Sequence, residues 1–64
     1  MAENKPACRF LLCVKNEGYP ALLEVRKVYQ AVPDVMAPAL NLVRVIDDTG
    51  EDYLYPEEYF IPPP

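Results

Sequence analysis

The 64-residue chain lacks histidine, serine and tryptophan altogether, and Thr49 is its only threonine. Without histidine, the Ser-His and Cys-His pairs of nucleophilic catalysis cannot be assembled. The two glycines, Gly18 and Gly50, are too few for a glycine-rich phosphate loop. Two cysteines without a histidine also fall short of the four ligands of a structural zinc site. These absences predict a protein that is not an enzyme and that uses no metal and no cofactor.

Basic residues are also scarce, with six lysines and arginines against ten acidic residues and a net charge of −4. The basic residues are scattered, so they form no face that could displace counterions from phosphate. The negative charge also disfavours an anionic membrane surface. Apolar runs are short, and the longest, FLLCV, cannot span a bilayer. We therefore expect the protein to bind neither nucleic acid nor membrane.

The two cysteines, Cys8 and Cys13, lie five positions apart in a predicted strand and would face opposite sides of it. A disulfide between them would be strained or impossible. We interpret them as buried free thiols, which indicates a reducing compartment; a redox role assisted by Arg9 and Lys15 is the alternative. The N-terminal sequence MAENKPA lacks a positive charge followed by an apolar run, so we expect a cytoplasmic protein.

A chain of this length forms one domain that buries only about 60% of its unfolded surface, which leaves little room for a deep pocket. We expect a flexible tail over 1–7, a single β-barrel domain over 8–61 and a proline tail over 62–64. The first strand is predicted over 8–14. Arg9 and Lys15 end one of its faces, so we expect the opposite face to be buried, namely Cys8, Phe10, Leu12 and Val14.

The rest of the chain predicts an all-β fold. A turn over 16–20 leads through a long loop to a β-branched strand over 27–34, and 35–41 contains either one helical turn or a loop. Residues 41–56 predict a β-hairpin whose DDTG turn places Gly50 in the left-handed conformation. PEEYF, 56–60, fits a proline-initiated 3-10 turn, and a short extended segment follows.

The end of this hairpin resembles the close of a Src-homology-3 barrel. In that family the fourth strand runs into a proline, a 3-10 turn carries a tyrosine, and a short last strand follows. The matching residues here are Leu54, Tyr55, Pro56, Tyr59 and Phe60. The resemblance implies a small five-stranded Src-homology-3-like barrel with one 3-10 turn near the C-terminus.

Most of residues 8–61 also resembles a group of small uncharacterised bacterial proteins. Their shared pattern is a cysteine-containing first strand, a Gly-Tyr turn, Leu-Glu before Lys-x-Tyr, a Val-Ile-Asp-Asp hairpin and a Tyr-Pro close. The corresponding residues are Cys13, Gly18, Tyr19, Leu23, Glu24, Lys27, Tyr29, Val45, Ile46, Asp47, Asp48, Tyr55 and Pro56. This resemblance implies a fold and no particular activity.

In the peptide-binding Src-homology-3 family, the proline and the tyrosine of the 3-10 turn line a groove for proline-rich ligands, and acidic loops pair with a basic ligand residue. In this chain the corresponding groove residues are Pro56 and Tyr59, with Leu54 nearby. Tyr19, which follows the turn over 16–20, could belong to the same surface. The acidic rim would be Asp47, Asp48, Glu51, Asp52, Glu57 and Glu58.

Each of these features also has a purely structural interpretation. Tyr29, Tyr53 and Tyr55 could fill the core, with their hydroxyls at its rim. The DDTGED segment lacks the spacing of an EF-hand, so a turn whose aspartates accept backbone hydrogen bonds is the simpler interpretation. These acids could also steer a basic partner toward the surface.

Three hypotheses follow. The first is a protein-interaction module or accessory subunit that docks a basic or proline-rich segment through the aromatic face and acidic rim. The second is an acidic inhibitor or decoy that occupies a basic site on a larger protein. The third is self-association through the C-terminal prolines.

Overall fold

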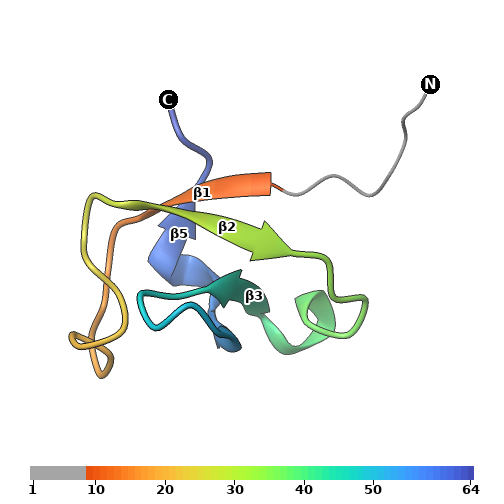
Figure 1. Ribbon diagram of the computed structural model, residues 1–64. Coiled ribbons are helices and arrows are strands. Elements are labelled where there is room, and N and C mark those ends of the chain that lie inside the picture. Colours follow the sequence, from red (N-terminus) through yellow and green to blue (C-terminus); the bar gives the residue numbers. More distant parts are fainter. Residues whose placement is uncertain (1–8) are drawn as a thin grey trace.

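The computed structural model describes residues 9–64, in which short strands alternate with loops and two 3-10 turns (Figure 1). The elements are β1 (Arg9–Cys13), β2 (Val28–Val32), η1 (Pro38–Leu40), β3 (Leu42–Ile46), β4 (Asp52–Pro56), η2 (Glu57–Tyr59) and β5 (Phe60–Ile61). The predicted tail over 1–7 and Cys8 lie outside the described residues. No helix within 9–64 is long and apolar enough to cross a membrane.

The strands form one antiparallel sheet in the order β4-β3-β2-β1-β5. The predicted all-β class with five strands is therefore confirmed. The predicted closure into a barrel is not confirmed, because β4 and β5 stand at opposite ends of this order and do not pair within residues 9–64.

The hairpin of β3 and β4 forms as its turn chemistry predicts. Gly50 has a φ of +87°, and its N–H donates to the carbonyl of Asp47 at 2.9 Å. The Asp47 N–H donates to the carbonyl of Glu51, also at 2.9 Å, and closes the ladder. A residue with a side chain rarely adopts that φ, so glycine is needed there.

The buried face of β1 is the opposite of the predicted one. Leu11 and Cys13 lie in the core, whereas Phe10 and Val14 are 55% and 41% exposed. Lys15 lies beyond the end of the strand, and Arg9 lies at its start. Charged residues at these positions can reach solvent without turning the whole face outward, so they were a poor guide to the central residues.

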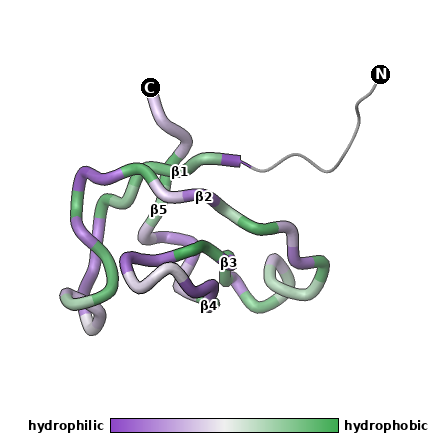
Figure 2. The backbone as a smooth tube through the Cα atoms, viewed as in Figure 1, coloured by the Kyte–Doolittle hydropathy of each residue, from purple (hydrophilic) through white to green (hydrophobic). Residues whose placement is uncertain are grey.

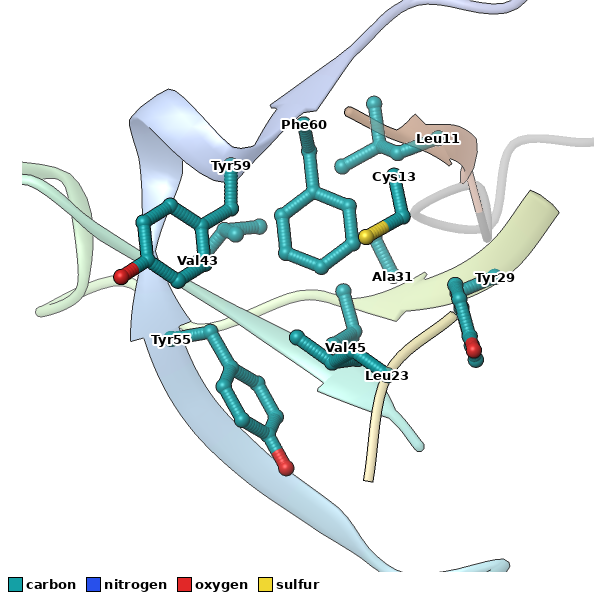
Figure 3. Close-up of a cluster of buried hydrophobic side chains, with 10 residues drawn as sticks. All are labelled: Leu11, Cys13, Leu23, Tyr29, Ala31, Val43, Val45, Tyr55, Tyr59 and Phe60. Carbon is teal, nitrogen blue, oxygen red and sulfur yellow. The ribbon is translucent and has the colours of Figure 1, made fainter. Parts of the chain in front are cut away.

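The core lies on one face of the sheet and is closed by the β1–β2 loop and by η2 (Figure 3). Its members are Leu11, Cys13, Leu23, Tyr29, Ala31, Val43, Val45, Tyr55, Tyr59 and Phe60. The predicted burial of Tyr29 and Tyr55 is confirmed, but Tyr53 is 49% exposed rather than part of the core. Burial raises the pKa of the Cys13 thiol, which favours an unreactive structural cysteine.

Two connections complete the fold. The segment between β2 and β3 contains η1 and has both hydrophobic and hydrophilic stretches in Figure 2; its residues Val35, Met36 and Leu40 are exposed. The β1–β2 loop, residues 14–27, is anchored by Leu23, which is fully buried. The side-chain amide of Asn16 donates to the carbonyl of Leu23 at 2.9 Å and fixes the loop from within.

Candidate functional site

The main candidate site is an open groove of about 470 Å³ between the β1–β2 loop, the β3–β4 turn and β4. We call it the β4 groove. Its lining residues are Tyr19, Leu22, Thr49, Glu51, Tyr53, Leu54 and Tyr55. Most of these side chains are apolar or aromatic, and the groove carries one carboxylate, that of Glu51.

Tyr19 forms the loop wall of the groove. Gly18, with a φ of +88°, makes the turn before it, as the sequence predicted. The Tyr19 ring lies edge-on to Tyr55, with 5.0 Å between centroids and 89° between planes, and it also contacts the ring of Tyr59 at 6.4 Å. This packing holds the ring in place and leaves Tyr19 36% exposed.

The β3–β4 turn ties the two walls together. The Asp48 N–H donates to the carbonyl of Leu22 at 3.0 Å, which fixes the loop wall to the turn. The Asp48 carboxylate accepts from Lys27 Nζ at 2.6 Å and from the Tyr29 hydroxyl at 3.0 Å. The hydrogen bond from Lys27 lowers the pKa of Asp48. The Tyr29 hydroxyl in turn accepts from the N–H of Glu24 at 2.7 Å.

Asp47 is the most buried acidic residue of the described chain, with 5% of its surface exposed. Its Oδ1 accepts from the backbone N–H and the hydroxyl of Thr49, and its Oδ2 accepts from the hydroxyl of Tyr55. Burial raises the pKa of Asp47, but the hydrogen bonds from Thr49 and Tyr55 outweigh this effect and leave the pKa below its ordinary value. The carboxylate is thus an ionised structural group under the groove.

The other acidic residues of the predicted rim lie in different places on the surface. Asp52 lies 3.5 Å from Arg44, which also pairs with Asp34 at 2.8 Å. Glu51 accepts from the Tyr53 hydroxyl at 2.8 Å and stays exposed at the edge of the groove. Glu57 and Glu58 are exposed on η2 and line a separate hollow with Asn41 and Pro56.

The structure therefore brings together only part of the predicted site. Tyr19, Leu54 and Glu51 share the groove, whereas Pro56, Glu57 and Glu58 lie beyond its end. Tyr59 is only 8% exposed, and its hydroxyl donates to the carbonyl of Glu17 at 2.7 Å. Asp47 and Asp48 are taken up by internal hydrogen bonds.

Four lining residues were not among the predicted site residues, namely Leu22, Thr49, Tyr53 and Tyr55. The alternation of Tyr53 with Leu54 and Tyr55 in a predicted strand gave a signal that could have found the tyrosines. Leu22 gave none, because its place depends on the path of a long loop.

The acids do not form a metal centre within residues 9–64, where no group of three or more metal-ligating side chains lies close enough to hold an ion. A scan against protein-family models and searches of curated proteins and of solved structures gave no match. The groove itself therefore carries the functional interpretation.

Proposed function

We propose that this protein is a small interaction module, without catalytic activity, that docks a basic segment of a partner protein in the β4 groove. The observation that carries the proposal is the groove itself: exposed Tyr19 and Tyr53 line its two walls, and Glu51 stands at its edge. Tyrosine supplies a large contact area and has few rotatable bonds to immobilise on binding, which suits it to this role.

The sheet order supports a Src-homology-3-like architecture for the module, as in the small bacterial proteins that the sequence resembles. β5 pairs with β1, and η2 lies between β4 and β5, as in the closing elements of that family. The ligand surface differs from that family's, because Tyr59 is buried and Pro56 lies outside the groove. A basic partner segment is therefore better supported than a proline-rich one.

The buried free thiol of Cys13 supports a reducing, cytoplasmic setting for the module. The acids give charge complementarity rather than most of the contact energy, because exposed charges are screened over about 10 Å at 0.1 M salt. Glu51 would then orient a basic partner residue, while the aromatic walls supply apolar contact.

The test is an affinity capture from cell lysate at low and at high salt with four proteins: wild type, Tyr19→Ala, Glu51→Lys and Phe10→Ala. Phe10 is a matched control, because it is an exposed aromatic residue of β1 that does not line the groove. We expect a partner that is retained by Phe10→Ala and lost by Tyr19→Ala, and weakened by Glu51→Lys.

Circular dichroism confirms that each variant is folded before it is used. A partner retained by both Tyr19→Ala and Glu51→Lys would refute docking in the groove. A partner that is lost at high salt but retained by Tyr19→Ala would instead support the acidic-decoy hypothesis.

A further inference from the structure

β4 is an exposed edge of the sheet. It stands at one end of the order β4-β3-β2-β1-β5 and, among residues 9–64, pairs with β3 alone. The β4 groove runs beside it, since Tyr53, Leu54 and Tyr55 are consecutive lining residues from this strand. An open strand edge offers unpaired backbone groups to another extended chain.

The ladder between β3 and β4 fixes which backbone groups face outward. Asp47 N–H donates to Glu51 at the turn, and Glu57 N–H donates to Asn41 at the far end. Bonded and non-bonded pairs alternate along an antiparallel ladder. Asp47–Glu51 and Asn41–Glu57 are thus bonded pairs, and the register runs continuously between them. Together they determine which of the intervening pairs are hydrogen-bonded.

The consequence is that Tyr53 and Tyr55 direct their N–H and C=O groups toward β3, whereas Asp52 and Leu54 direct theirs away from the sheet. Among residues 9–64, no backbone hydrogen bond from a loop reaches Asp52 or Leu54. The strand therefore presents two donors and two acceptors in the register of a β-ladder, directly beside the aromatic groove.

The opposite edge of the sheet, formed by β5, is blocked, in contrast to β4. β5 has only two residues and runs directly into Pro62, Pro63 and Pro64. Short strands and prolines are the means by which proteins blunt exposed edges. β4 has five residues, and its only proline, Pro56, is the last of them.

Charge decides what kind of chain can pair with β4. Glu51 precedes the strand, Asp52 is its first residue, and Glu57 follows it. Pairing of β4 with a second copy centred on Leu54 would place Glu51 opposite Glu57, and pairing centred on Asp52 would place that residue opposite itself. Only a pairing centred on Tyr53 avoids placing acidic residues of the strand opposite one another, and this pairing still joins two chains that each have a net charge of −4. Like charges opposite one another destabilise a ladder.

We propose that β4 binds its partner by strand addition, with an extended segment of another protein pairing antiparallel to Asp52 and Leu54. This inference rests on the proposed docking function and specifies its ligand. Residues opposite Tyr53 and Tyr55 lie on the groove side and are apolar. Residues opposite Glu51 and Glu57 are basic. The pattern is basic-x-apolar-x-apolar-x-basic.

The test uses the acetylated and amidated peptide Lys-Thr-Val-Thr-Val-Thr-Lys, which is the same read in either direction. Amide hydrogen exchange of the full-length protein is measured by NMR with and without this peptide. We expect exchange at Leu54 and Asp52 to slow by roughly tenfold at ten times the Kd. The amides of Tyr53 and Tyr55, which are bonded to β3, serve as internal controls.

Two methylated peptides isolate the backbone contact. N-methylation of the central threonine removes the N–H that would donate to Leu54 and should abolish binding. N-methylation of either valine alters an N–H that points away from β4 and should leave binding within a few-fold of the parent. A peptide with glutamate in place of both lysines should bind at least tenfold more weakly.

The outcomes separate the two proposals. Equal binding by both methylated peptides, together with loss of binding in Tyr19→Ala, would overturn strand addition and leave groove docking intact. Protection of Leu54 that survives Tyr19→Ala would support the open edge and refute the groove. No binding of the parent peptide, or no slowing of exchange at Leu54 and Asp52, would overturn strand addition.

Discussion

Replacing Tyr55 with phenylalanine tests the polar network under the groove. The substitution keeps the ring and its edge contact with Tyr19, and it removes only the hydroxyl. That hydroxyl donates to Asp47 Oδ2, which has no other hydrogen-bond donor within residues 9–64. Asp47 as a whole residue is 5% exposed, so water cannot readily replace the lost donor. Half of a buried charged group is left unpaired.

A hydrogen bond to a charged group contributes about 1.5–3 kcal/mol to stability, and the cost of an unsatisfied buried acceptor is of the same order. We therefore expect Tyr55→Phe to lower the free energy of unfolding by about 2 kcal/mol. A 64-residue domain has a total stability of about 3–10 kcal/mol. The loss would lower the Tm by roughly 8–16 °C.

The pH dependence carries a second signature. The native pKa of Asp47 lies below its ordinary value, so its stabilisation is fully present above the unfolded pKa of about 3.9 and is lost as the pH falls through the native pKa. Removing the Tyr55 hydroxyl raises the native pKa of Asp47. The Asp47 carboxylate of the variant is therefore protonated at a higher pH than that of the wild type. As the pH falls, the difference in the free energy of unfolding between wild type and variant decreases.

Urea denaturation at pH 7 and at pH 3 measures both effects. Tyr53→Phe is the matched control, because its hydroxyl donates to the exposed carboxylate of Glu51 and its loss should change stability little. A Tyr55→Phe loss no larger than that of Tyr53→Phe would contradict the network. A stability gap that widens toward pH 3 would contradict the assignment of an ionised Asp47.

Further predictions concern the loops and the oligomeric state. Arg26 has a φ of +77°, so Arg26→Gly should raise stability by about 0.5–1 kcal/mol in thermal unfolding. Asn41→Gly should change it less, because asparagine tolerates the left-handed conformation that it adopts at a φ of +60°. Leu23→Ala should cost about 2–5 kcal/mol because this side chain is fully buried, whereas Val25→Ala, at a 40% exposed position, should be nearly neutral. Deleting residues 62–64 should leave the sedimentation coefficient that of a monomer; a wild-type oligomer that dissociates on this deletion would support self-association instead.

The features that the sequence predicted best depend on local chemistry. The β3–β4 turn could be located because Gly50 supplies a positive φ and the Asp47 side chain accepts from the Thr49 N–H. The 3-10 turn after Pro56 was predicted for a similar reason, since proline suits the start of such a turn. In each case the deciding interactions lie within four residues of one another.

The features that were missed depend on contacts between distant residues. Leu11 rather than Phe10 faces the core, and alternation alone could not choose between two faces that were both largely apolar. Tyr59 was predicted to line a ligand groove, but it is buried, and its hydroxyl donates to the carbonyl of Glu17, 42 positions earlier. The path of the β1–β2 loop gave no periodic signal, so the Leu22 wall of the groove could not be predicted.

Asp47 and Asp48 link these observations, because they stabilise the turn to which both walls of the groove are attached. Leu22 is bound by the Asp48 N–H, and Tyr55 donates to the Asp47 carboxylate. A chain this short has a small core, which alone can stabilise little of a 14-residue loop. Buried polar contacts therefore help to hold the β1–β2 loop in place. In the proposed docking mode they would also hold the groove walls in place before a ligand arrives, which would lower the entropy lost on binding. In the proposed docking mode, Asp47 and Asp48 would therefore act on binding through the rigidity of the site, and Glu51 is the carboxylate of the groove itself that would face the ligand.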